Sequence, residues 1–202
     1  MSIIIKFLIC LIFSIGSVKA VNNSNINNKK MISYVCSIFF TVLFLLLVFV
    51  PIEDFLWQFK TIEEAYEYRN PNAEITLVIE GRESAFVSGD ENGKETVMFV
   101  PKSNGVWKIG TGLETKRIAK SLHENVLVEI YQYKDSSDFY VMVYDMLGKE
   151  IDIIDSSNSK YISMKKEKNN GTVITKYYAY ISNYDKNYWI SVDDEQIELR
   201  ME

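Results

Sequence analysis

The sequence predicts an α+β fold, mostly antiparallel β, that follows an N-terminal transmembrane helix. Three observations predict it: an uncharged run over residues 31–52, a helical apolar spacing over residues 55–69, and short alternating runs between polar turns from there onward. The expected order is a transmembrane helix, a short amphipathic helix, a β-meander and a second β-rich sheet or sandwich. The boundaries expected for these parts are 1–30 (a signal-like or short membrane segment plus a polar linker), 31–52, 53–112 and 113–202.

Charge divides the chain unevenly. The 202 residues carry a net charge of −5, yet the first 52 hold four lysines and no acidic residue. Residues 53–202 therefore hold 18 basic and 27 acidic side chains, a net charge of −9. This acidic balance argues against nucleic acid as a partner. Both cysteines, Cys10 and Cys36, precede residue 53, so the remainder has no disulfide, no thiol nucleophile and no cysteine-bound metal.

The transmembrane helix is expected over residues 31–52. These 22 residues lack charge, and their Phe, Leu, Val and Ile side chains leave no polar face. A helix of about 20 residues crosses the roughly 30 Å of hydrocarbon in a bilayer. Pro51 comes near the end, where it terminates a helix at little cost. The sequence thus predicts the lipid bilayer as a partner of residues 31–52.

The apolar segment before it is shorter. Phe7–Val18 gives only 12 residues, with Lys6 before it and "VKA" after it, as in a secretory signal cleaved after Ala20. Two other interpretations stay open: a second, short membrane helix, or a true start at Met31 that makes residues 1–30 a translation artefact. The asparagine-rich "VNNSNINNKK" is expected to be a flexible linker.

The flanking charges predict the orientation. Lys29 and Lys30 precede the long apolar run, and Glu53 and Asp54 follow it. Because positive charge is retained in the cytoplasm, the remainder of the chain is expected outside the cell membrane. If the first segment spans the membrane with its N-terminus inside, the remainder is cytoplasmic instead. A single-pass or a two-pass anchor is compatible with the sequence.

A helix is predicted over residues 55–69, because its apolar residues recur every three or four positions. Thr61 and Glu64 have the spacing of a capping box, so the helix is expected to restart at Thr61. Asn70-Pro71 is expected to end it. Phe55 and Trp57 are candidates for the lipid headgroup level or for packing on the body.

Four β-type runs follow, which predicts an antiparallel meander. Asn92-Gly93 and Asn104-Gly105 are hairpin signals, since type I′ turns require positive φ at both central positions. The runs are "EITLVIEG", "ESAFVSG", "ETVMFVP" and "GVWKIG".

The C-terminal part is predicted to be a second set of strands with alternating apolar residues. The expected strands are 115–122, 126–133, 139–145, 150–155, 172–183, 188–192 and 196–200. The lysine-rich "MKKEKNNGT" is expected to be a solvated hairpin tip.

The motifs "EEAYEY", "GVWKIG", "GKEIDIIDSSNSKY" and "TKYYAYISNYDKNYWISV" resemble uncharacterised membrane-anchored extracytoplasmic proteins of low-GC Gram-positive bacteria. The resemblance extends over most of residues 60–200. It implies an extracytoplasmic bacterial setting and no particular activity.

No catalytic, cofactor-binding or metal-binding residues are predicted. His123 is the only histidine and is expected in an exposed turn, without the G-x-S-x-G elbow of a serine hydrolase. Acidic residues such as Asp152, Asp155, Asp193 and Asp194 lack the spacing of a calcium loop and are interpreted as solvated turn residues.

Aromatic residues gather near the C-terminus and suggest a possible binding surface. An exposed aromatic strip binds glycan or peptide through flat, rigid rings. The alternative is a core strand, with Tyr178 and Tyr180 on one face and Tyr177, Ala179 and Ile181 on the other; the core is favoured. The candidate surface residues are Tyr178, Tyr180, Tyr184, Tyr188 and Trp189.

The expected role is binding or assembly at the bacterial cell surface rather than catalysis, with a protein or cell-wall partner and no cofactor. One alternative is a surface enzyme whose carboxylates converge only in the fold. Another is a membrane-tethered regulatory domain in the cytoplasm.

Overall fold

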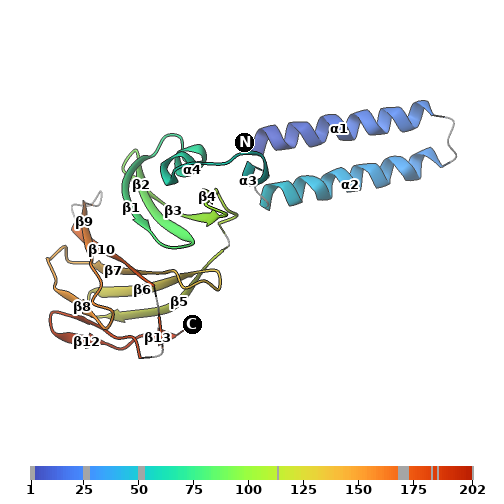
Figure 1. Cartoon of the computed structure of the whole chain (residues 1–202). Coiled ribbons are helices and arrows are strands. Elements are labelled where there is room, and N and C mark those ends of the chain that lie inside the picture. Colours follow the sequence, from blue (N-terminus) through green and yellow to red (C-terminus); the bar gives the residue numbers. More distant parts are fainter. Residues whose placement is uncertain are drawn as a thin grey trace. The chain divides into compact units, whose positions relative to one another are not determined.

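The computed structural model describes residues 3–24, 28–49, 53–112, 114–167, 173–182, 184–185 and 187–201. The chain forms two compact units, Met1–Gln58 and Phe59–Glu202 (Figure 1). The predicted meander and the predicted C-terminal strands therefore belong to one compact unit rather than to two.

The first unit is an antiparallel helical hairpin. Helix α1 is Ile3–Asn23, α2 is Lys29–Phe49, and α3 is a single turn at Glu53–Leu56. The first two helices run side by side (Figure 1). By length and composition, both are able to cross a membrane, over Lys6–Asn23 and Lys29–Leu47. Residues 50–52, at the end of the predicted span, lie outside the described residues.

Helix α4, Ile62–Arg69, opens the second unit and begins at the predicted cap. The Glu64 N–H donates to Thr61 Oγ1 at 3.2 Å, while Glu64 Oε2 accepts from the Lys60 N–H at 2.8 Å. The predicted helical segment 55–69 is interrupted: α3 ends at Leu56, and α4 restarts after Thr61, as the capping box indicated. Ile62, Ala65 and Tyr66 form the buried face of α4.

The predicted meander is present as a four-stranded antiparallel sheet in the order β1-β2-β3-β4. Asn92 and Gly93 have φ of 54° and 82°, and Asn104 and Gly105 have φ of 51° and 79°, so both Asn-Gly turns have the predicted conformation. The strands are β1 Glu74–Glu80, β2 Ser84–Glu91, β3 Lys94–Ser103 and β4 Val106–Trp107.

The remaining strands form two further antiparallel sheets, of order β13-β5-β6-β7-β10-β9 and β12-β11-β8. Two of them, β6 and β7, have the predicted boundaries. The first of these sheets contains β5 Thr115–His123, β6 Val126–Tyr133, β7 Phe139–Asp145, β9 Ile162–Glu167, β10 Val173–Ile181 and β13 Arg200–Met201. The other contains β8 Ile153–Asp155, β11 Ile190–Val192 and β12 Glu195–Ile197.

Two differences from the predicted strands have physical reasons. The edge strand β9 includes Met164–Glu167, the first four residues of the segment expected to be a hairpin tip, and the other five residues of that segment lie outside the described residues. The lysines of β9 suit an edge, where charge discourages pairing with other chains. The single strand predicted at 196–200 is divided, because β12 pairs with β11 and β13 pairs with β5 in a different sheet.

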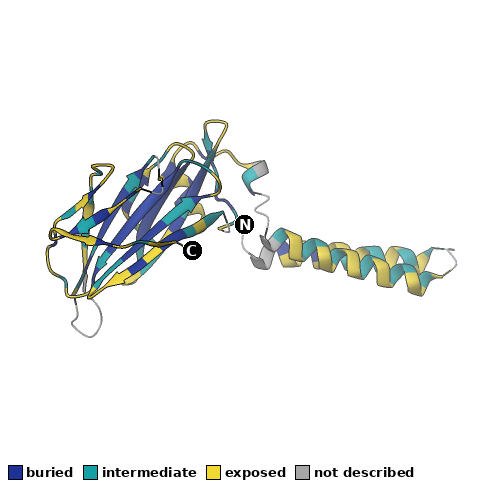
Figure 2. Cartoon of the chain, turned by 90° about the horizontal axis from the view of Figure 1, so that it is seen from below, coloured by how far each residue is buried: buried dark blue, intermediate teal, exposed yellow. Residues whose placement is uncertain are grey.

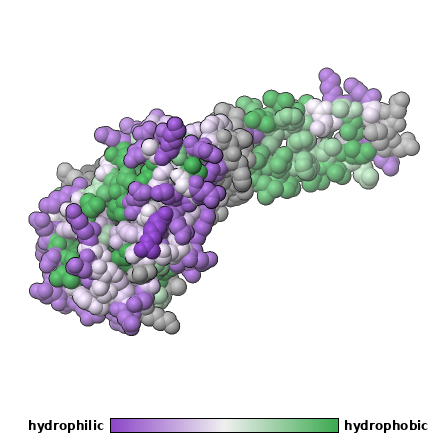
Figure 3. Space-filling model, viewed as in Figure 1, coloured by the Kyte–Doolittle hydropathy of each residue, from purple (hydrophilic) through white to green (hydrophobic). Residues whose placement is uncertain are grey.

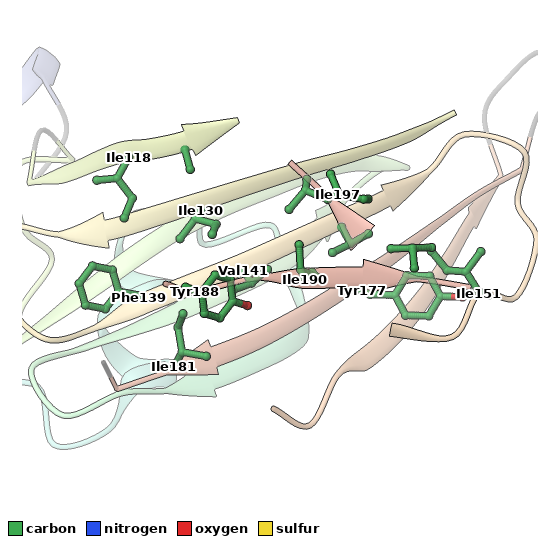
Figure 4. Packing of buried hydrophobic residues seen from close by; sticks show 14 residues of the cluster. Ile118, Ile130, Phe139, Val141, Ile151, Tyr177, Ile181, Tyr188, Ile190 and Ile197 are labelled. Carbon is green, nitrogen blue, oxygen red and sulfur yellow. Dashed lines mark hydrogen bonds between the residues drawn. The ribbon is translucent and has the colours of Figure 1, made fainter. Parts of the chain in front are cut away.

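The second unit is a stack of layers around the six-stranded sheet. Strands β7 and β10 alternate large apolar side chains to both faces, so this sheet is buried on both sides (Figure 2). One face packs on the three-stranded sheet, through residues such as Val141, Tyr177 and Ile190 (Figure 4). The other face packs on the four-stranded sheet, whose far side carries α4.

Candidate membrane anchor and binding surface

The α1–α2 hairpin presents an almost continuous apolar surface (Figure 3). Large apolar side chains on both helices are exposed, including Ile12 and Phe13 on α1 and Val35 and Ile38 on α2. A water-soluble protein rarely exposes an apolar area of this extent. The surface is compatible with a pair of helices that contact lipid.

The charged groups of the hairpin lie toward its two ends. At the connected end, Lys29 Nζ donates to the Asn22 carbonyl oxygen at 3.0 Å, and Lys19 and Lys30 lie nearby in the sequence. At the open end, Lys6 Nζ donates to the Leu47 carbonyl oxygen at 3.0 Å and lies 3.2 Å from Glu53 Oε2. The side chains of Lys6 and Glu53 are only 7% and 2% exposed.

The five predicted surface aromatics do not form one strip. Tyr178 is 2% exposed, stacks on Phe86 at 5.1 Å between ring centroids and packs between the four-stranded and six-stranded sheets. Tyr188 is 8% exposed and lies with the residues between the six-stranded and three-stranded sheets. Tyr178 and Tyr188 are thus core residues, as the alternative interpretation of the sequence expected for Tyr178.

The other three aromatics differ in exposure. Tyr180 and Tyr184 are half-buried, and the ring of Tyr184 lies 5.5 Å from Phe139 and 5.3 Å from Tyr188. Trp189 is 38% exposed. Of the predicted surface, Trp189 is the most exposed residue.

Trp189 has an apolar neighbour that the sequence did not indicate. Strands β8 and β11 pair so that Ser191 lies opposite Ile154. The Ser156 N–H donates to the Trp189 carbonyl oxygen at 3.0 Å, so the same pairing continues from Ile190 to Trp189. Residues two apart in a strand share a face, which places Trp189 diagonally from Ile154. Ile190 and Asp155 point inward, and Ile154 is 46% exposed. Trp189 and Ile154 define the "outer apolar pair" of the three-stranded sheet.

Asp138 is a buried carboxylate that joins the four-stranded and six-stranded sheets. Its oxygens accept from the backbone N–H groups of Arg82 at 3.0 Å and Glu83 at 2.7 Å, and from Ser84 Oγ and Tyr180 OH, each at 2.9 Å. Burial and the bond to Asp138 raise the pKa of Tyr180 to about 12, so this phenol remains a donor. Asp138 therefore serves as a structural acceptor between sheets.

Asp155 corrects the interpretation of the acidic residues as solvated. It is 4% exposed and accepts from the N–H groups of Ser157 and Ser159 and from the hydroxyls of Tyr161 and Tyr188, each at 2.9 Å. These four donors fix the turn after β8 to the core. A carboxylate with this set of donors has a structural function.

His123 is the last residue of β5 rather than a turn residue, but its side chain is exposed, at 46%, as expected. Its Nε2 lies 3.2 Å from Glu195 Oε2, whose side chain is 70% exposed. Within the described residues, His123 makes no hydrogen bond to a serine or threonine hydroxyl. The pair has the character of a surface contact between β5 and β12.

Glu95 forms a half-buried ionic cluster where the four-stranded and six-stranded sheets meet. Its carboxylate accepts from Lys176 Nζ, from Tyr178 OH at 3.0 Å and from Ser88 Oγ at 3.1 Å. Burial raises the pKa of Glu95, but the ion pair with Lys176 and the hydroxyl donors outweigh burial, and the net pKa lies below its ordinary value of 4.5. The ionised carboxylate thus stabilises the contact between the two sheets.

We predict that this cluster makes stability pH-dependent. A lowered pKa means that Glu95 stabilises the fold fully above its ordinary value of 4.5, and that this contribution is lost as the pH falls through the lowered pKa. The variant Glu95→Gln is expected to lower the free energy of unfolding by about 1–2 kcal/mol at pH 7. When the urea unfolding midpoint is plotted against pH, the variant is expected to show a smaller fall on the acidic side than the wild type. An acid limb identical to that of the wild type would contradict this role.

Asp138 and Glu95 were missed as key polar residues because most of their donors lie far away in the sequence. Asp155 was missed although three of its four donors lie within six residues, because its burial depends on the fold. The partners of Asp138 and Glu95 lie 42 to 83 residues away, except for Ser88, seven residues from Glu95.

Within the described ranges, no group of three or more metal-ligating side chains is present. A shallow depression beside α4 is lined by Phe59, Glu64, Glu67, Tyr68, Pro71 and Ala73.

Comparison of the chain with protein-family models, with curated proteins and with solved structures found no match.

Proposed function

We propose that the chain is a membrane-anchored binding or assembly module of the bacterial cell surface, with its β-rich unit on the extracytoplasmic side. The observation that carries the proposal is the hairpin of two apolar helices, each 21 residues long. At 1.5 Å per residue each helix is about 31 Å long, which matches the hydrocarbon thickness of a bilayer. Two such helices leave the N-terminus and the β-rich unit on the same side.

The lysines support the extracytoplasmic side. Lys19, Lys29 and Lys30 lie at or near the connection between the helices, whereas Glu53 and Asp54 follow α2. The positive-inside rule retains the connection in the cytoplasm, and the β-rich unit is then outside. This two-pass arrangement differs from the one considered from sequence alone, where an N-terminus inside would have made the body cytoplasmic.

A binding role is favoured over catalysis by how the acidic residues are used. Asp138 and Asp155 each accept four hydrogen bonds that are partly or fully buried, and Glu95 accepts from a lysine, a tyrosine and a serine. These carboxylates stabilise the fold. The outer apolar pair, Trp189 and Ile154, instead offers two exposed apolar side chains of the kind that bind the apolar face of a peptide or a glycan.

A photocrosslinking experiment tests the binding role. A photoreactive phenylalanine derivative placed at Trp189 in intact cells is expected to give a discrete adduct, and Ile154→Ser is expected to reduce its yield several-fold. The matched control is the same derivative at Lys116, an exposed residue of β5 away from the outer apolar pair. Absence of an adduct at position 189, or the same adducts at both positions, would contradict a specific surface at the outer apolar pair.

A further inference from the structure

The open end of the hairpin is closed by an ion pair that lies out of contact with water. Lys6 belongs to α1 and Glu53 begins α3, and their charged atoms lie 3.2 Å apart. Lys6 Nζ also donates to the carbonyl oxygen of Leu47, near the C-terminal end of α2, where the helix dipole favours a cation. Lys6 is therefore placed by two elements that follow it by more than 40 residues.

Contacts continue along the whole seam between the helices. From the open end toward the connection, the ring of Phe7 lies 5.4 Å from Phe44, and Phe13 stacks on Phe40 at 6.5 Å. Cys10, between these rings on α1, is 6% exposed. At the connection itself, Lys29 reaches Asn22. The first helix is thus packed on α2 over its full length.

The predicted cleavage position lies inside a packed helix. Ala20 lies inside α1, which continues to Asn23. Proteases act preferentially on exposed loops and extended segments, and a residue in a packed helix is a poor substrate. A signal peptide also keeps its basic residue in the cytoplasm, whereas Lys6 is buried against Glu53.

We infer that the first helix is a permanent half of the anchor, and that the Lys6–Glu53 pair fixes the N-terminus and the β-rich unit on the same membrane face. This inference rests on the membrane placement proposed above, but not on which face is outside. Among the interpretations left open by the sequence, it selects the second membrane helix.

The ion pair also explains how Lys6 is compatible with an N-terminus outside. A lysine near a membrane-spanning segment normally opposes translocation of its own end. Pairing with Glu53 neutralises Lys6, so the three lysines Lys19, Lys29 and Lys30 decide the orientation. Lys19 lies four residues before the end of α1, close enough for its long side chain to extend to the interface.

The test uses the full chain with short uncharged epitopes at both termini, expressed in cells. We expect an intact mass that retains residues 1–20, and both epitopes on the same membrane face. Lys6→Glu or Glu53→Lys is expected to lower the amount of inserted chain at least about fivefold, and the double reversal Lys6→Glu with Glu53→Lys to recover most of it. Lys94→Glu, the same charge change at an exposed residue of the β-rich unit, is the control.

The outcomes separate this inference from the proposed function. A mature chain that begins at Val21, epitopes on opposite faces, or a double reversal no better than the single reversals would overturn the inference. Loss of the N-terminal epitope with the C-terminal epitope outside overturns the inference and leaves the extracytoplasmic proposal standing. A result in which both epitopes lie in the cytoplasm supports the hairpin and overturns the extracytoplasmic placement.

Discussion

Asp138→Ala is expected to lower the free energy of unfolding of the β-rich unit by roughly 3–5 kcal/mol. The reason is the number of donors that lose their acceptor: two backbone N–H groups, of Arg82 and Glu83, and the hydroxyls of Ser84 and Tyr180. Asp138 and Ser84 are both 0% exposed, so water cannot readily replace the carboxylate. A domain with a typical stability of about 5–15 kcal/mol would lose a large fraction of it.

The site has little room to adjust. A Cβ atom at Gly81 would lie 2.7 Å from both Asp138 Oδ2 and the Tyr140 hydroxyl, so the β1–β2 turn is closely packed against the carboxylate. The variant Asp138→Asn keeps one acceptor oxygen but replaces the other with an amide NH₂ group, which would face the N–H and O–H donors that surround Asp138. It is expected to be destabilised by an intermediate amount, because some of the four hydrogen bonds remain possible.

The measurement is urea unfolding of the full chain in detergent micelles, followed by tryptophan fluorescence, with Trp57 and Trp189 replaced by Phe so that Trp107, which is 5% exposed, is the reporter. The matched control is Asp135→Ala, an exposed aspartate in the turn before β7, with an expected change within about 0.5 kcal/mol. If Asp138→Ala and Asp135→Ala shift the midpoint equally, Asp138 does not join the sheets as described.

Local signals in the sequence were sufficient for much of the fold. The Asn-Gly pairs at 92–93 and 104–105 determine their turns through backbone conformation alone, and those turns fix the order of the meander. Strands β6 and β7 were predicted with their observed boundaries because polar turns bound them closely. Thr61 marked the start of α4 for the same local reason.

Long-range contacts were not accessible in this way. The burial of Asp138 depends on a turn 54 to 56 residues earlier, and the burial of Tyr178 depends on Phe86 from another sheet. The spacing of aromatic residues identified a group of rings but not which of them face solvent. Ile154 was missed in the outer apolar pair because its position is defined by its pairing with Ser191, in a different part of the chain.

The anchor shows a similar division. The length of residues 31–52 sufficed to predict α2, whereas the 12-residue apolar run Phe7–Val18 left a cleaved signal, a short membrane helix and a translation artefact open. In the structure, α1 extends to Asn23 because its lysines and asparagines lie near the helix ends, and its inner face packs on α2. Tertiary packing thus lengthens a helix that its own composition leaves undecided.

The second large effect expected is an all-or-none difference in labelling across the membrane. The β-rich unit contains no cysteine, so replacing Cys10 and Cys36 by Ser gives a background without thiols. A single cysteine is then introduced either at Asp135, exposed in the β-rich unit, or at Asn23, exposed at the end of α1. Under the proposed topology the two positions lie on opposite sides of the membrane.

Labelling of intact cells with a membrane-impermeant maleimide compares these two positions most directly. The account predicts that Asp135→Cys reacts in intact cells and that Asn23→Cys reacts only after the membrane is permeabilised. The reverse pattern would place the β-rich unit in the cytoplasm, and reaction of both positions in intact cells would show that the helices do not span the membrane. Either result would contradict an extracytoplasmic unit held by a two-helix anchor.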